Sequence, residues 1–141
     1  MAEWLSAEDF QQAFRFVREI EDARAGQVLQ AEGVVRFTPD AAGLVYQESG
    51  HLRVPGHAPM QTERRYLWRF DTTGVAVFFE DGRPFHRFVP AGWGNGTDHP
   101  CGADHYRVDY DFSGWPRWRA TWQVRGPRKD YVSRTEHMPL P

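Results

Sequence analysis

Hydrophobic and polar residues alternate with a period of two along most of this chain, which is the spacing of a β-strand with one buried face. The clearest case is the segment 27–37, whose inward set would be Leu29, Ala31, Gly33, Val35 and Phe37. The small side chains at Ala31 and Gly33 would let a crossing strand or a ligand approach closely. The pattern therefore predicts strands, with unusual room at one of them.

A helix is expected only near the N-terminus. Ser6 precedes two acidic residues, which is the form of an N-cap followed by a first helical turn. Phe10 and Phe14 would then lie on one face of that helix. We expect a short helix over residues 6–14, with strands from about residue 15 to residue 137.

Turn signals divide the remainder of the chain into about ten strand segments, with a tight hairpin at Ser49-Gly50. The segments are 14–22, 27–37, 44–48, 52–54, 63–71, 75–80, 84–89, 106–112, 118–124 and 130–137. Their connections leave no room for crossover helices, and a meander of this size usually closes because closure removes exposed edges. We predict an all-β fold, an antiparallel up-and-down barrel of about 8–10 strands, as one domain over residues 1–141.

The charge, cysteine content and hydropathy of the chain exclude several classes of partner and site. The formal charge is −2, whereas surfaces that bind nucleic acid or anionic membranes need clustered Lys and Arg. A single cysteine, Cys101, excludes an intramolecular disulfide. The N-terminus lacks the pattern of a signal peptide, and no apolar run is long enough to span a bilayer. We expect a cytoplasmic monomer or homodimer with no nucleic-acid or membrane partner.

A barrel of this size can hold one small ligand if its inward side chains do not fill it. Aromatic residues make up 15% of the chain, and many fall at inward positions. The sequence leaves open whether these rings line a cavity or plug it. The set is Tyr66, Trp68, Phe70, Tyr106, Tyr110, Phe112, Trp118, Trp122 and Tyr131.

Reactive side chains cluster around a long glycine-rich segment, residues 90–103, which resembles a lid or binding loop. The residue types would suit a zinc site or a Cys-His-Asp nucleophile, but their spacing matches no closed metal motif. We therefore assign no metal, no cofactor and no catalytic residue. The cluster is His86, His99, Cys101, Asp104 and His105.

Charged residues at strand positions have two interpretations. Lys129, with Arg125 and Arg65, could clamp a ligand carboxylate or phosphate, or Lys129 could simply pair with an acid at a turn. Arg18 shares the inward face of its strand with Phe16, so it must be paired if it is buried.

Two segments carry a family resemblance: His-x-Cys-x-x-Asp-x-Tyr, ending at Tyr106, and Gly-Pro-Arg-Lys-Asp-Tyr over residues 126–131. With residues 18–22, 44–50, 65–68 and 79–86, they make the chain similar to an uncharacterised bacterial family, a domain of unknown function related to calycin or lipocalin-like β-barrels. The resemblance implies a barrel over nearly the whole chain and supplies no established reaction. It makes His86 a candidate haem ligand, and it implies that Arg18 packs across Trp68 or Trp122 to close one barrel end.

One departure limits the resemblance. Residues 13–16 read Ala-Phe-Arg-Phe where the family commonly carries Gly-x-Trp. This weakens any transfer of ligand preference but not of fold.

We expect the barrel to bind a small apolar or amphipathic molecule, including one with an anionic end. The alternatives are an enzyme with a His/Asp/Tyr/Lys or Cys/His site at the barrel mouth, and an interaction module with a filled barrel. The candidate ligand-binding residues are Tyr46, Arg65, Trp68, His86, His99, Cys101, Asp104, Tyr106, Trp122 and Lys129.

Overall fold

The computed structural model describes residues 3–95 and 98–141, and it confirms the predicted all-β antiparallel barrel with one short helix. The helix is α1 (Ala7–Phe10). The strands are β1 (Ala13–Asp22), β2 (Gln27–Asp40), β3 (Gly43–Arg53), β4 (Met60–Asp71), β5 (Gly74–Phe79), β6 (Pro84–Phe88), β7 (Trp93–Asn95), β8 (Asp98–Cys101), β9 (Asp104–Asp111), β10 (Trp118–Gly126) and β11 (Lys129–Pro139).

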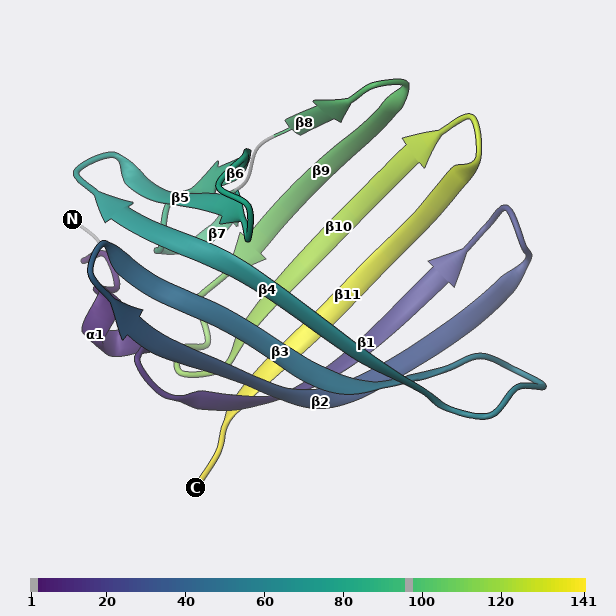
Figure 1. The fold of residues 1–141 in the computed structure, drawn as a ribbon, viewed down its shortest axis with the longest axis horizontal. Coiled ribbons are helices and arrows are strands. Elements are labelled where there is room, and N and C mark those ends of the chain that lie inside the picture. The colour runs from purple at the N-terminus through teal and green to yellow at the C-terminus, as the bar shows by residue number, and fades with distance from the viewer. Residues whose placement is uncertain (1–2, 96–97) are drawn as a thin grey trace.

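The strands follow one another as a meander whose first and last members meet. Their order is β6-β5-β4-β3-β2-β1-β11-β10-β9-β7, and β8 also pairs with β9. The described sheet therefore ends at β6 on one side and at β7 and β8 on the other, and these edges face each other across a seam (Figure 1). The barrel is nearly closed, and the seam is its one break in the ladder of described strands.

Aromatic stacking spans this seam in place of backbone pairing. Phe85 of β6 stacks on Trp122 of β10 with ring centroids 5.0 Å apart, and Phe88 of β6 stacks on Tyr110 of β9 at 4.2 Å. Such ring pairs contribute about 0.5–1.5 kcal/mol each beyond the area they bury. The seam is therefore packed by side chains that also face the barrel interior.

The helix is shorter than the predicted 6–14. Ser6 and Asp9 form the expected capping box, but α1 ends at Phe10, and Phe14 lies in β1. The backbone N–H of Phe37 donates to the Gln12 carbonyl at 3.1 Å, so the chain joins the sheet two residues beyond the helix. From Ala13 onward the backbone pairs with β2, so its polar groups have sheet partners in place of helical ones.

The predicted hairpin at Ser49-Gly50 is wrong, because β3 runs unbroken through both residues. Gly50 pairs with Gly33 of β2, and the ring of Phe16 lies over the two glycines. A Cβ built on Gly33 would lie 2.8 Å from that ring and would collide with the Ser49 carbonyl oxygen. The glycines therefore let the Phe16 ring and the backbone of the neighbouring strand β3 approach closely, whereas the expectation at residues 31 and 33 was a crossing strand or a ligand.

The predicted loop 90–103 is also partly wrong. Trp93–Asn95 and Asp98–Cys101 form β7 and β8, and both pair with β9. This part of the chain lies beside the open edge of β9, so its backbone groups find partners there. Gly96 and Thr97 of the expected lid lie outside the described residues.

Phe10 closes one end of the barrel. It is fully buried, and its ring contacts six other aromatic rings with centroids 4.9–6.1 Å apart. These rings come from β2, β4, β10 and the β9–β10 connection: Phe37, Trp68, Phe70, Phe112, Trp115 and Trp118. Interlocking rings of this kind fill the barrel completely beside α1, so any cavity must lie towards the opposite end.

Candidate ligand-binding cavity

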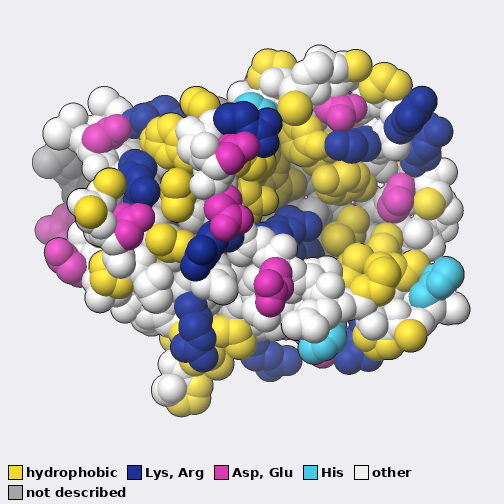
Figure 2. All heavy atoms as spheres, in the orientation of Figure 1, with side chains coloured by type: hydrophobic (Ala, Val, Ile, Leu, Met, Phe, Trp, Pro, Cys, Tyr) yellow, Lys and Arg dark blue, Asp and Glu magenta, His cyan; other side chains and the backbone are white. Residues whose placement is uncertain are grey.

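The barrel encloses a cavity of about 500 Å³ on the side away from Phe10. Asp22, Phe79, Cys101 and Tyr131 line it and lie beside turns at the end opposite α1, which places the mouth there. Figure 2 shows a hollow on this face with hydrophobic and basic side chains around it. The interaction-module alternative requires a barrel filled with side chains. This barrel has an internal cavity, so it is not filled.

Aromatic rings form the outer half of the wall. Phe85 stacks on Phe79 at 4.4 Å and on Trp122 at 5.0 Å, so the three rings are nearly parallel along the seam. The rings of His99 and Tyr106 lie edge-on to Phe85, with ring centroids 5.3 and 6.5 Å from its centroid. The mouth thus presents flat apolar surface with polar tips.

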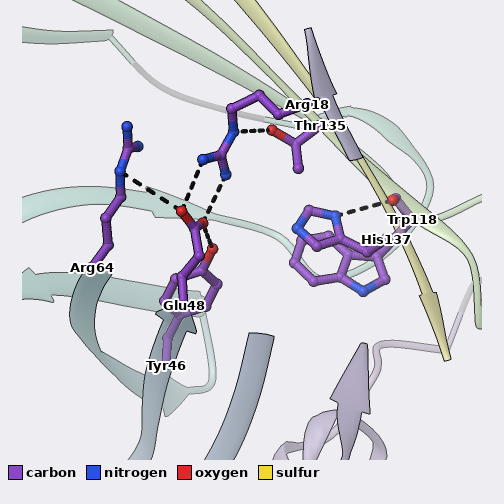
Figure 3. A network of polar contacts seen from close by, with 7 residues as sticks. All are labelled: Arg18, Tyr46, Glu48, Arg64, Trp118, Thr135 and His137. Carbon is purple, nitrogen blue, oxygen red and sulfur yellow. Dashed lines mark hydrogen bonds and ion pairs between the residues drawn. The ribbon is translucent and has the colours of Figure 1, made fainter. Parts of the chain in front are cut away.

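A buried ion pair links β1 and β3 inside the barrel (Figure 3). Arg18 of β1 donates from Nη1 and Nη2 to the two carboxylate oxygens of Glu48 of β3, at 2.8 and 2.7 Å, and from Nε to Thr135 at 2.7 Å. The Tyr46 hydroxyl donates to the same carboxylate at 2.6 Å. The guanidinium also lies 4.8 Å from the ring of Phe16, rather than over Trp68 or Trp122 as the resemblance implied.

These contacts fix the charges of the pair. Burial alone would raise the pKa of Glu48, but its hydrogen bonds to Arg18 and the charges of Arg18 and Arg64 outweigh this and lower the pKa to about 2. Burial, followed by the Glu48 charge, raises the pKa of Tyr46 well above its ordinary value. The Glu48 carboxylate is therefore ionised and the Tyr46 hydroxyl protonated across the whole neutral range.

His86 of β6 lies in the wall with one ring nitrogen unpaired. Its Nε2 shares a hydrogen bond of 2.9 Å with the Tyr110 hydroxyl across the seam, whereas its buried Nδ1 has no partner among the described residues. Burial, with a smaller effect from His99, lowers the pKa of His86 to about 3, so the imidazole is neutral. A neutral ring with one occupied nitrogen leaves the other as a donor or an acceptor for a second molecule.

A second orphan group lies deeper in the wall. The buried indole Nε1 of Trp118 also lacks a partner among the residues described. His137 stacks on this indole at 3.5 Å, and its Nδ1 bonds the Trp118 carbonyl oxygen at 3.2 Å (Figure 3). Burial lowers the pKa of His137 to about 3. Both histidines of the interior are thus neutral.

The sequence matches the model of a family of unknown function, DUF6314, over residues 10–139. The chain belongs to this family. A search of curated proteins finds no match to it. Among solved structures, the S-type phycobiliprotein lyase CPES from Guillardia theta is similar to the DUF6314 chain, with a TM-score of 0.56, 10% sequence identity, and coverage of 96% of this chain and 90% of that one. At this identity the likeness shows the fold alone.

The cavity of the DUF6314 barrel brings together most of the candidate ligand-binding residues. Those that line it are Tyr46, Trp68, His86, His99, Cys101, Tyr106 and Trp122. Arg65 does not: it lies on the outer face of β4, where it bonds Gln47 at 3.4 Å and approaches Glu80 at 3.8 Å. The hypothesis that Arg65 forms part of an anion clamp is therefore not supported by its position.

Lys129 and Asp104 lie at the rim, outside the cavity lining. Lys129 Nζ donates to the Tyr106 hydroxyl at 2.7 Å and pairs with Asp104 at 3.1 Å. The hydrogen bond to Tyr106, and after it the contact with Asp104, raises the pKa of Lys129. Lys129 is therefore a poor base or nucleophile at neutral pH. This is the structural alternative for the turn: Lys129 orients a cavity residue and neutralises an acid.

The described residues form neither the zinc site nor the Cys-His-Asp nucleophile that their residue types would suit. Among the described residues no group of three or more His, Cys, Asp or Glu side chains converges to hold a metal ion. Cys101 is exposed, and the Asp104 carboxylate binds Lys129 instead of an imidazole. None of the helices in the described ranges has the length and apolar character that crossing a bilayer requires.

The sequence reasoning missed Glu48 and Arg64 as cavity residues. The alternation of inward and outward positions along a strand could have identified both residues. Glu48 is two residues from Tyr46, and Arg64 is two residues from Tyr66, so each shares the inward face of its neighbour. Arg64 approaches Glu48 at 3.8 Å between Nε and Oε2.

Proposed function

We propose that the cavity binds one small, largely apolar organic molecule that also forms a hydrogen bond with the barrel wall. The observation that carries this proposal is His86, whose buried Nδ1 has no partner within the described ranges 3–95 and 98–141 and lies in the wall of a cavity of about 500 Å³. Natural ligand pockets have this size, with mostly aromatic and aliphatic walls and a few convergent polar groups.

Leaving a buried polar group unsatisfied costs about 1–3 kcal/mol. Two such groups occur among the residues that the structure describes, on His86 and Trp118, and both residues line the same cavity. A ligand that offers a hydrogen-bonding oxygen or nitrogen would recover this free energy, while its apolar body would stack on the rings at the mouth. The wall is therefore built for a molecule with a flat hydrophobic part and at least one polar group.

Protonation states favour binding over acid–base catalysis. A general acid or base works best when its pKa lies near the working pH. The pKa values of Glu48 and His86 lie at about 2 and 3, and that of Tyr46 is raised well above its usual value. These interior groups keep one protonation state at neutral pH, which suits a recognition surface.

The test uses N-phenyl-1-naphthylamine, a neutral aromatic probe whose fluorescence rises in apolar surroundings. Ala120 is 7% exposed and lines the cavity, whereas Gln123 lies on the outer face of the same strand. We expect saturable binding of one probe by the wild-type chain, at least tenfold weaker binding by Ala120→Phe, and a change within twofold for Gln123→Phe.

Ser133→Phe fills the cavity from β11 and serves as the second variant, should Ala120→Phe fail to fold. Circular dichroism checks that each variant is folded. No saturable binding by the wild-type chain, or equal binding by the filled and control variants, would contradict the proposal. Native mass spectrometry of freshly purified protein would then identify any molecule that co-purifies.

A further inference from the structure

We infer that the preferred ligand is an aromatic organic anion and that Arg64 binds its anionic group at the cavity mouth. This inference rests on the proposed function, because it names the chemical class of the molecule and the residue that selects it. Four observations carry it: the saturation of Arg18, the position of Arg64, the arrangement of the other charges, and the flat apolar surface beside Arg64.

Arg18 cannot be the receptor for a ligand anion. All three of its nitrogen atoms already donate, two of them to Glu48 and one to Thr135, and the side chain is 8% exposed. The Glu48 carboxylate balances its charge at 2.7 Å. An incoming anion would have to compete with a buried bidentate pair, which is among the strongest of polar contacts in proteins.

Arg64 is in the opposite situation. Its side chain is 51% exposed, and its ion pair is the 3.8 Å approach to Glu48, a carboxylate that Arg18 already neutralises. The cluster therefore holds two guanidinium groups for one carboxylate. Arg64 supplies the excess positive charge, with donors available for a planar anion such as a carboxylate or sulfonate.

Arg64 also lies where an anionic group would lose little of its hydration on binding. It borders both the main cavity and a shallow outer groove that includes Phe79 and Arg83. A charged group held at this junction keeps part of its hydration, whereas a charge carried to the floor of the barrel would lose it. The apolar body of the ligand can extend inward while its charge remains at the mouth.

The remaining charged groups leave this position free for an anion. Asp22 lines the cavity, but its carboxylate accepts the backbone N–H of Ala25 at 3.1 Å in the β1–β2 turn. Asp104 is neutralised by Lys129 at the rim. The interior histidine His86 is neutral. Glu80 and Asp81 line the groove beside Arg64, and they pair with Arg65 at 3.8 Å and with Arg83 at 2.7 Å. The described acids near this position are thus hydrogen-bonded or paired.

The flat surface beside Arg64 selects an aromatic body. Phe79 is shared by the cavity and the groove, and Phe85 stacks on it with an interplanar angle of 20°. Trp122 continues this stack at 12° to Phe85. The Arg83 guanidinium lies over the Phe79 ring at 5.0 Å, but Asp81 pairs with it at 2.7 Å. A planar ring system with one anionic substituent matches three nearly parallel rings that share a groove with the Arg64 guanidinium.

Two probes with one common body test the inference. 8-Anilinonaphthalene-1-sulfonate is N-phenyl-1-naphthylamine with an added sulfonate, so the ratio of their affinities reports the contribution of the charge. Arg64→Gln removes the proposed receptor, and Arg134→Gln removes the same charge from a half-exposed residue of β11 that borders neither the cavity nor the groove. We expect Arg64→Gln to weaken binding of the sulfonate about tenfold and of the neutral probe less than twofold, and Arg134→Gln to change both less than twofold.

Equal losses of both probes in Arg64→Gln would overturn the inference, because Arg64 would then only shape the cavity. Equal losses of the sulfonate in Arg64→Gln and Arg134→Gln would also overturn it, because surface charge in general would then be responsible. If the neutral probe binds the wild-type chain and Arg64→Gln leaves the sulfonate unaffected, the inference fails while the proposed function stands. If neither probe binds the wild-type chain, both fail.

Discussion

Arg18 and Glu48, on the two strands that flank β2, meet inside the barrel and form two hydrogen bonds of 2.8 and 2.7 Å, although 30 residues separate them in the chain. Their side chains are 8% and 1% exposed. Neither charge could remain ionised there alone, since an isolated buried charge costs several kcal/mol. Each residue is therefore tolerated only because β1 and β3 lie on either side of β2.

Breaking this pair should destabilise the barrel strongly. Glu48→Gln leaves the Arg18 guanidinium buried without a counter-charge, and we expect a loss of about 3–5 kcal/mol in the free energy of unfolding. Urea denaturation monitored by tryptophan fluorescence measures this. The double variant Arg18→Met/Glu48→Leu should be more stable than Glu48→Gln.

The matched control is the exposed pair of Arg119 and Glu136, which meet at 2.9 Å on the outer face. Glu136→Gln should change stability by about 1 kcal/mol or less. Equal effects of Glu48→Gln and Glu136→Gln would show that the interior pair is not structurally required.

Stability should fall as the pH falls from neutrality. Burial lowers the pKa of His86 and of His137 from 6.5 to about 3, so between these values the unfolded chain binds two protons that the folded chain does not. Glu48, with its pKa lowered from 4.5 to about 2, extends the loss of stability below pH 4.5. Each histidine should contribute a slope of about 1.4 kcal/mol per pH unit between pH 6 and pH 4.

His137→Phe tests this dependence, because phenylalanine retains the stacking on Trp118 but cannot bind a proton. We expect its free energy of unfolding to depend on pH less steeply than that of the wild type, by about 1.4 kcal/mol per pH unit. His57→Gln, at an exposed position in the β3–β4 turn, is the control. A wild-type slope in His137→Phe would contradict the assignment of a neutral buried imidazole.

Gly33→Ala should destabilise the barrel more than a glycine-to-alanine substitution at an open position does. The added methyl group would lie 2.5 Å from the Gly50 Cα and 2.8 Å from the Phe16 ring, and it would meet the backbone of β3, which cannot move aside without loss of pairing. Overpacking of this kind costs about 1–3 kcal/mol. Thermal unfolding of Gly114→Ala gives the comparison, since a methyl group there meets its nearest atom at 3.5 Å.

Phe10→Ala should open the closed end of the barrel. Removing a fully buried ring that contacts six others leaves a cavity, and we expect a loss of about 3–5 kcal/mol. Trp4→Ala, at a residue 45% exposed, removes a large ring nearby without creating an internal cavity. Similar melting temperatures for the two variants would argue that α1 is dispensable.

Local patterns were sufficient where one face of a strand is buried. The alternation in residues 27–37 correctly gave the inward positions of β2, including Ala31, Val35 and Phe37. The same patterns misled at Ser49-Gly50, because a glycine that permits a turn and a glycine that permits close packing are identical in sequence. Only the position of Gly33 on the neighbouring strand distinguishes the two.

The sequence by itself determined the fold class, the meander and the aromatic character of the interior, because these follow from a period of two and from short connections. Tertiary structure decided which charges meet. Arg64 and Arg65 are chemically identical neighbours, yet one lines the cavity and the other lies on the outer face. The pairing of Arg18 with Glu48, the unpaired nitrogen of His86 and the empty volume beside it depend on strand register and ring packing across the barrel, which no local pattern records.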